Sequence, residues 1–229
     1  MKRIRVRRLF KYTKSEFVDL LRTLGRIRVG TAYEFRIPDG LTGARSDVDE
    51  AMTVWAPGDH VERLHKDHPF LKYLDSNGTP IHPNADRIQL KFESGTELKF
   101  EGNIFVLSFC MEISPLQRRR MLHEFGHDVC FRVDDINGFF DAVSSHPLLR
   151  GRPRAQGPVI YEWSTQKTFR EPSPWYKAQV YGWQREWRMV WGGSDIPREG
   201  VLIDVPAIIP LIKLTKLGNA NLEQLAKDL

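Results

Sequence analysis

The segment from Tyr181 to Trp191 concentrates the side chains most able to do chemistry in this chain of 229 residues. Its alternation of apolar and polar residues predicts a strand over 183–191. One face would carry Trp183, Arg185, Trp187, Met189 and Trp191, and the other Gln184, Glu186, Arg188 and Val190. The second face then presents an amide, a carboxylate and a guanidinium in register. Such a set suits a polar substrate, but it also suits the solvated face of an edge strand, with Arg188 simply paired to Glu186.

A second motif, His123-Glu124-Phe125-Gly126-His127, matches the HExxH pattern of zinc peptidases. On a helix, histidines four residues apart share a face and can hold Zn²⁺ while the glutamate activates water. The longer pattern that supplies a third histidine does not continue, because Val129–Val133 alternates like a strand and carries no histidine. We therefore expect no metal. A zinc hydrolase stays the alternative, and a helix end with solvent-facing histidines is the simpler structural explanation.

The elements that must position these residues follow from periodicity and from turn residues. Strands are predicted near 4–12, 25–36, 87–93, 97–101, 104–110, 129–133, 159–164, 183–191, 200–204 and 208–217. Helices are predicted near 13–24, 59–67, 115–125 and 134–144, with a closing helix from about 219. The nearly continuous apolar run at 104–110 is typical of a central strand. This mixture predicts an α+β fold in one domain over 1–229, with 56–87 as a possible insertion.

Composition excludes several classes of protein. No apolar run approaches the roughly 20 residues of a membrane span, and the basic N-terminus lacks the apolar segment of a secretion signal. The two cysteines, Cys110 and Cys130, lie in apolar strand patterns, which favours free buried thiols and a cytoplasmic location. The net charge of +5 is compatible with an anionic partner such as nucleic acid or a phosphate-bearing cofactor.

Several segments, taken in order, resemble a large, poorly characterised bacterial family with an ADP-ribosyltransferase-like fold, related in outline to toxins and phage-defence enzymes. The matching segments are 9–12, 25–31, 33–36, 45–50, 105–110, 121–131, 184–188 and 212–219. Within them, Gln184-Arg185-Glu186 is similar to the [Gln/Glu]-x-Glu element, whose second acid is catalytic. The chain departs from much of the family at Gln184, where glutamate is expected. That position helps to choose the acceptor of the transfer.

The resemblance implies mixed or antiparallel sheets with flanking helices, NAD⁺ as substrate and no metal. It implies that Glu186 stabilises the oxocarbenium-like transition state and that Gln184 orients the acceptor. Side chains expected to bind NAD⁺ are Arg8, Arg36 and Arg45 for the pyrophosphate, Tyr12 or Tyr33 for stacking on nicotinamide, and Thr31 as a hydroxyl donor. A purely structural role stays open for each of these six residues.

The basic charge favours nucleic acid over protein as the acceptor. A toxin or phage-defence effector of this kind would have an antitoxin or defence-system partner, and no membrane is expected. A further alternative is a non-catalytic basic domain that binds RNA or DNA and has lost the chemistry.

Overall fold

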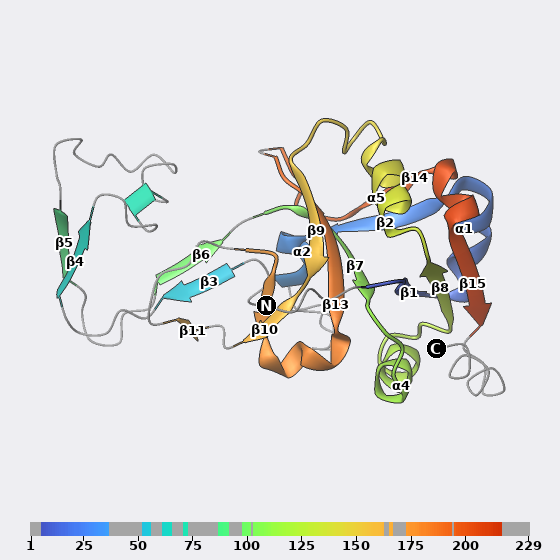
Figure 1. Ribbon diagram of the computed structural model, residues 1–229, viewed down its shortest axis with the longest axis horizontal. Coiled ribbons are helices and arrows are strands. Elements are labelled where there is room, and N and C mark those ends of the chain that lie inside the picture. Colours follow the sequence, from blue (N-terminus) through green and yellow to red (C-terminus); the bar gives the residue numbers. More distant parts are fainter. Residues whose placement is uncertain are drawn as a thin grey trace.

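Strand β7 (Phe105–Cys110) forms the centre of an eight-stranded sheet in which the described strands pair antiparallel (Figure 1). The computed structural model describes residues 6–36, 52–55, 61–65, 71–72, 87–91, 98–101, 103–162, 165–166, 173–193 and 195–216. One edge of β7 pairs along its whole length with β13 (Glu186–Trp191), which also pairs with β9 (Arg154–Pro158). The predicted central strand is confirmed, because five of the six residues of β7 are buried.

The other edge of β7 is shared by two strands, so the sheet divides there. Strand β2 (Arg26–Thr31) pairs with the start of β7 and continues to β14 (Val201–Asp204). Strand β1 (Leu9–Thr13) pairs with the end of β7 and continues through β8 (Val129–Val133) to β15 (Ile212–Lys216). The main core cluster joins apolar side chains from both branches, and so the two branches enclose one core.

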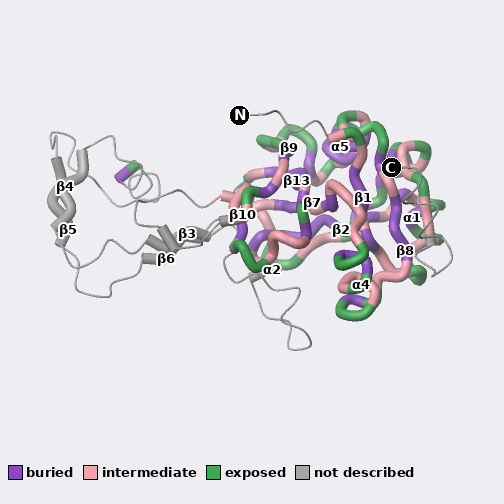
Figure 2. Tube along the Cα trace, turned by 60° about the horizontal axis from the view of Figure 1, so that its bottom comes forward, coloured by how far each residue is buried: buried purple, intermediate pink, exposed green. Residues whose placement is uncertain are grey.

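Helices complete this core on one face of the sheet. Helix α1 (Val18–Leu24) follows the 3₁₀ turn η1 (Ser15–Phe17), and helix α5 (Ile136–Ser144) is capped by the Asp135 side chain. The 3₁₀ segment η3 (Pro206–Leu211) contacts both helices. The buried positions of α1, α5 and η3 contribute Leu21, Phe139, Phe140, Val143 and Ile208 to the main core. Figure 2 shows the buried parts of α5 and of the central strands in purple.

The opposite face of the sheet carries helix α4 (Pro115–His123) and a smaller core of Phe10, Tyr12, Cys110 and Cys130. Ser114 caps α4 through a capping box with Gln117, and Pro115 occupies the first turn, as its sequence predicts. Met121 of α4 packs against this smaller core. Both cysteines are buried free thiols, which confirms that expectation.

Three smaller sheets complete the described strands. Strand β10 (Ile160–Glu162) pairs in parallel with β12 (Tyr176–Ala178), and β3 (Met52–Trp55) pairs with β6 (Leu98–Glu101) and β11 (Thr165–Gln166). Strand β4 (Val61–His65) pairs with β5 (Arg87–Lys91). The helix predicted near 59–67 is therefore wrong over 61–65, because pairing with a distant strand overrides local helical spacing. That 56–87 is an insertion stays a prediction.

Other features also differ from prediction, among them the strand expected over 208–217, which begins only at Ile212 because η3 occupies Pro206–Leu211. The strand expected over 25–36 ends at Thr31, whose hydroxyl accepts a hydrogen bond from Glu34 N at 3.1 Å and starts helix α2 (Ala32–Arg36). The first strand begins at Leu9 instead of residue 4 within the described part. Along η1 and α1, Leu21 is buried but Phe17 and Leu20 are 48% and 38% exposed, so only part of the predicted apolar stripe is buried. No helix in the described ranges has the length and apolar character to cross a bilayer.

Candidate functional site

The backbone bends sharply just before Glu186. Residues Gln179–Gln184 form the 3₁₀ segment η2, and strand β13 begins only at Glu186. Between them, Arg185 has a φ of 44°, which costs a non-glycine residue about 1–3 kcal/mol. The Arg185 carbonyl accepts from Met111 N at 2.9 Å, and its guanidinium pairs with Glu112 at 3.0 Å. The strand predicted over 183–191 is therefore wrong for its first three residues.

Glu186 is the centre of a buried polar cluster. Its Oε1 accepts from Lys177 Nζ at 3.0 Å, and its Oε2 accepts from Arg188 Nε at 2.9 Å. Arg188 also donates to the Pro174 carbonyl at 2.6 Å. The side chains of Lys177, Glu186 and Arg188 are 8%, 11% and 1% exposed. The alternative of a solvated face is therefore wrong, because this face is buried, and the Arg188–Glu186 pair that the sequence allowed is present.

Gln184 joins this cluster although it lies on a different element. Lys177 Nζ donates to Gln184 Oε1 at 2.8 Å while it holds Glu186, so one ammonium group bridges the two side chains. Gln184 is itself buried. Strand alternation was the predicted reason for Gln184 and Glu186 to lie together, but the observed reason is the bend at Arg185 and the shared lysine.

Two further residues fix the cluster to its neighbours. Gln117 Nε2 donates to the Gln184 carbonyl at 2.7 Å, which ties η2 to α4. Its Oε1 accepts from Ser114 N at 3.1 Å, so one side chain serves both the helix cap and the cluster. The Glu186 backbone N donates to Tyr161 Oη at 2.8 Å. We call Gln117, Tyr161, Lys177, Gln184, Glu186 and Arg188 the Glu186 cluster.

The cations decide the charge state of Glu186. Burial by itself would raise the pKa of this carboxyl group, but the charges and hydrogen bonds of Lys177 and Arg188 outweigh burial and lower the pKa to about 2. Burial raises the pKa of the neighbouring Tyr161 hydroxyl, and the negative charge of Glu186 raises it further. Glu186 is therefore a fixed carboxylate at neutral pH, beside a neutral phenol.

Tyr12 lies on the same face of the sheet as Glu186. Its neighbour two residues earlier, Phe10, pairs with Cys110, which pairs in turn with Glu186. Tyr12 is 5% exposed, and its hydroxyl has no hydrogen-bond partner in the described structure. Burial raises its pKa well above the ordinary value. Stacking of Tyr12 on nicotinamide would require this buried position to open.

Thr31 and Tyr33 lie away from the Glu186 cluster. Thr31 pairs with Phe105, five residues along β7 from the partner of Glu186, which is about 16 Å at about 3.3 Å per residue. Phe105 belongs to the main core, so Thr31 faces the opposite side of the sheet from Glu186. The Thr31 hydroxyl donates to the Arg198 carbonyl at 2.6 Å, and the Arg198 guanidinium lies 4.8 Å from the Tyr33 ring centre.

Of the three arginines expected to bind the pyrophosphate, only Arg8 has a described side chain. Arg8 precedes strand β1 and is half-buried. Arg36 is the last residue of α2, and its side chain lies outside the described part, as does the whole of Arg45. Of the eight side chains expected at an NAD⁺ site, the structure thus brings Gln184 and Glu186 together and sets Tyr12 on the same face.

The HExxH segment does not have zincin geometry. Helix α4 ends at His123, and Glu124 is its C-cap, paired with Arg120 at 3.4 Å. Gly126 has a φ of 65°, which turns the chain before His127. The two histidines therefore do not lie one turn apart on a helix. Within the described ranges, no group of three or more His, Cys, Asp or Glu side chains is arranged to hold a metal ion.

Sequence reasoning missed Lys177, Gln117 and Tyr161. Lys177 lies in a three-residue strand, too short for a periodic signal, and its role depends on the parallel pairing of β12 with β10. Gln117 did carry a signal as the third helical residue of a Ser-x-x-Gln cap, but that signal says nothing about Gln184.

Comparison with known proteins adds no family: no family model, curated protein or solved structure matches this chain. The chain is a mixed α+β protein with a mostly antiparallel sheet. Any function must therefore be argued from the Glu186 cluster itself.

Proposed function

We propose that this chain is an NAD⁺-dependent ADP-ribosyltransferase with an ADP-ribosyltransferase-like fold, and that it modifies a macromolecule. The observation that carries the proposal is the convergence of Glu186 and Gln184 on one buried lysine beside the central strand. A carboxylate and an amide two residues apart match the [Gln/Glu]-x-Glu element in both type and spacing. The bend at Arg185 supports a functional role, since strained backbone gathers at active sites.

The charge state of Glu186 suits the reaction. Cleavage breaks the bond between the ribose C1′ and the nicotinamide nitrogen; nicotinamide leaves with the electron pair, and the sugar develops an oxocarbenium-like charge. A carboxylate that is ionised at neutral pH and held on a strand can accept a hydrogen bond from the ribose 2′-OH and stabilise that charge. The acceptor nucleophile then bonds to C1′ and releases its proton, with Gln184 as the residue that orients it.

We expect substrate binding to exchange one contact of Glu186, because its buried carboxylate is enclosed by Lys177 on Oε1 and Arg188 on Oε2. Lys177 is the partner to exchange: its ammonium group holds Gln184 and Glu186 together, and an NAD⁺ pyrophosphate is a natural competitor for it. Arg188 would stay in place, because it is anchored to the Pro174 carbonyl. Lys177 would thus move from Glu186 to the phosphates and leave Oε1 free for the ribose.

The decisive experiment measures nicotinamide release from NAD⁺ by wild type, alone and with RNA, DNA or cell lysate. We expect release that is insensitive to chelators, with label from the ADP-ribose portion in one acceptor fraction. Glu186→Gln should abolish release. Glu186→Asp, which keeps the charge but shortens the side chain by one methylene, should reduce it by about 100-fold. Glu112→Gln, which removes an exposed carboxylate on the neighbouring turn, is the matched control.

Circular dichroism must show that each variant is folded before its rate is interpreted. Absence of nicotinamide release by wild type with every acceptor would refute the proposal. Release that survives in folded Glu186→Asp at the wild-type rate would show that another residue is responsible. The nucleic-acid preference rests on the net charge of +5, and an antitoxin or defence-system partner stays a prediction from the resemblance.

A further inference from the structure

The outer face of α4 carries an unusual set of side chains. Its outward stripe consists of Leu116, Arg119 and His123, which are exposed, and Arg120, which is half-buried. Spacings of three, four and seven residues put these side chains on one side of the helix. The other side holds Gln117 and Arg118, both buried against the sheet. Three of the four residues of this stripe are basic, and Pro115–His123 contains no acidic residue.

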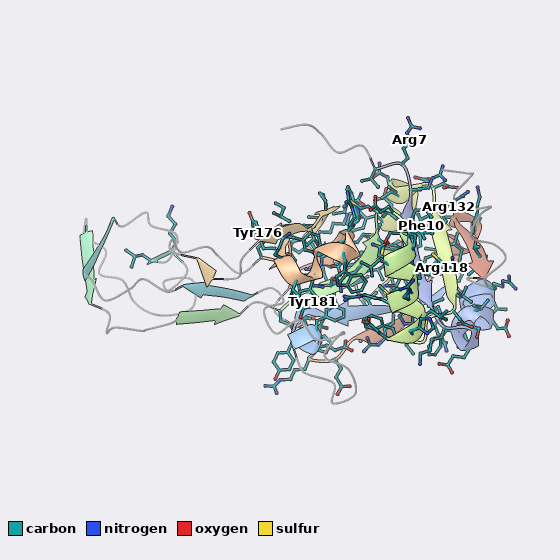
Figure 3. All side chains as sticks on the ribbon, turned by 90° about the horizontal axis from the view of Figure 1, so that it is seen from below. Arg7, Phe10, Arg118, Arg132, Tyr176 and Tyr181 are labelled. Atoms are coloured by element: carbon teal, nitrogen blue, oxygen red, sulfur yellow. The ribbon has the colours of Figure 1, made fainter. Side chains whose placement is uncertain are left out.

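The 3₁₀ segment η2 extends this face with aromatic and apolar groups. The Arg120 guanidinium lies 4.6 Å from the Trp183 ring centre, which is a cation–π contact. Val180 is 73% exposed and Leu116 is 51% exposed. The hydrogen bond from Gln117 to the Gln184 carbonyl fixes η2 beside α4. Figure 3 looks onto this side of the molecule, with α4 in front of the sheet and η2 beside it. We call Leu116, Arg119, Arg120, His123, Val180 and Trp183 the α4–η2 surface.

Two nearby carboxylates offset only part of this positive charge. Glu124 pairs with Arg120 at 3.4 Å, and Glu112 pairs with Arg185 at 3.0 Å. Arg119 and His123 are exposed and form no ion pair with a described residue. The surface therefore offers cationic groups to a ligand next to an aromatic ring and exposed apolar side chains. A small anion would bind to the arginines without using the Trp183 ring. An apolar partner would bind to the ring and the apolar side chains without using the arginines.

We infer that the α4–η2 surface binds a single-stranded nucleic acid, which is the acceptor of the proposed transfer. Phosphates complement Arg119, Arg120 and His123, and an unstacked base complements the Trp183 ring, because every base has a π face. Trp183 directly precedes Gln184 in η2, and Gln117 holds that segment against α4, so a strand bound to Trp183 lies next to the segment that carries the proposed acceptor-orienting residue. The role of the bound strand as acceptor rests on the proposed function, whereas the binding of the strand does not.

The test is fluorescence anisotropy of short labelled oligo(dT) and oligo(rU) with the full chain, without NAD⁺, between about 50 and 200 mM salt. Trp183→Ala should weaken binding by about 5- to 150-fold, and Trp183→Phe should restore most of it. Arg119→Gln should lower the slope of log affinity against log salt by about 0.7, the value for one phosphate contact on a single strand. Arg22→Gln removes an exposed cation from α1, on the other face of the sheet, and should leave binding unchanged.

Equal effects of Arg119→Gln and Arg22→Gln would overturn the inference, because binding would then follow net charge alone. Wild-type affinity in Trp183→Ala would overturn it as well. Binding of a labelled poly-glutamate peptide as tight as that of the oligonucleotides would indicate an acidic protein partner instead. Because the assay contains no NAD⁺, a failure here is distinct from a failure of nicotinamide release. Thermal unfolding of each variant excludes misfolding as the cause of any loss.

Discussion

Replacement of Glu186 by glutamine should strongly destabilise the protein at neutral pH. The change removes the carboxylate that compensates two buried cations, Lys177 and Arg188. Removal of one partner from a buried ion pair costs about 3–5 kcal/mol, because the remaining charge stays buried. By contrast, Glu112→Gln disturbs an ion pair whose side chains are 58% and 46% exposed, and it should cost at most about 1 kcal/mol.

The lowered pKa of Glu186 also determines how the stability of the protein depends on pH. The pKa of Glu186 falls from 4.5 to about 2 on folding, which at about 1.4 kcal/mol per pKa unit contributes about 3 kcal/mol to stability. A lowered folded-state pKa means that this contribution is complete above about pH 4.5 and is lost as the pH falls towards 2. At pH 3 about 2 kcal/mol of it should be gone. The glutamine variant has no such carboxyl group and should lack this part of the acid destabilisation.

Urea denaturation of wild type, Glu186→Gln and Glu112→Gln, followed by tryptophan fluorescence at neutral pH and near pH 3, measures these differences. We expect the gap between wild type and Glu186→Gln to narrow as the pH falls. A gap below about 1 kcal/mol at neutral pH would refute the account of a buried, cation-bound carboxylate. So would a gap that does not depend on pH, since the carboxyl group would then have the same pKa in both states.

Three further outcomes follow from other positions. Tyr12→Phe should leave the melting temperature unchanged or raise it, because the hydroxyl it removes is buried without a described hydrogen-bond partner. Gly25→Ala should lower the free energy of unfolding by more than about 1 kcal/mol in denaturant titrations, because Gly25 has a φ of 63° and an added Cβ would lie 2.1 Å from the Val205 carbonyl oxygen. Cys110 and Cys130 should react with a thiol reagent at pH 8 only after unfolding, since burial raises the pKa of both, that of Cys130 to about 12.

Local sequence patterns were sufficient for several elements. The apolar run of β7, the alternation of β8 and the Ser114–Pro115 start of α4 each encode their structure within a few residues, and all three were predicted. The same holds for the free cysteines, which lie inside apolar strands. The prediction failed where a partner distant in sequence decides the outcome, as at β4, which pairs with β5 instead of forming a helix.

The candidate site was likewise predictable from the sequence only in part. The sequence by itself determined that Glu186, Gln184 and Arg188 are clustered polar residues among tryptophans, because residue type and spacing are visible without a fold. Only the tertiary structure decided that the strand starts after a left-handed Arg185, that the polar face is buried, and that Lys177 joins it from β12. The physical reason is that burial and charge compensation depend on which segments pack together. A lysine nine residues away in sequence becomes a partner of Glu186 only after β10, β12 and β13 have assembled.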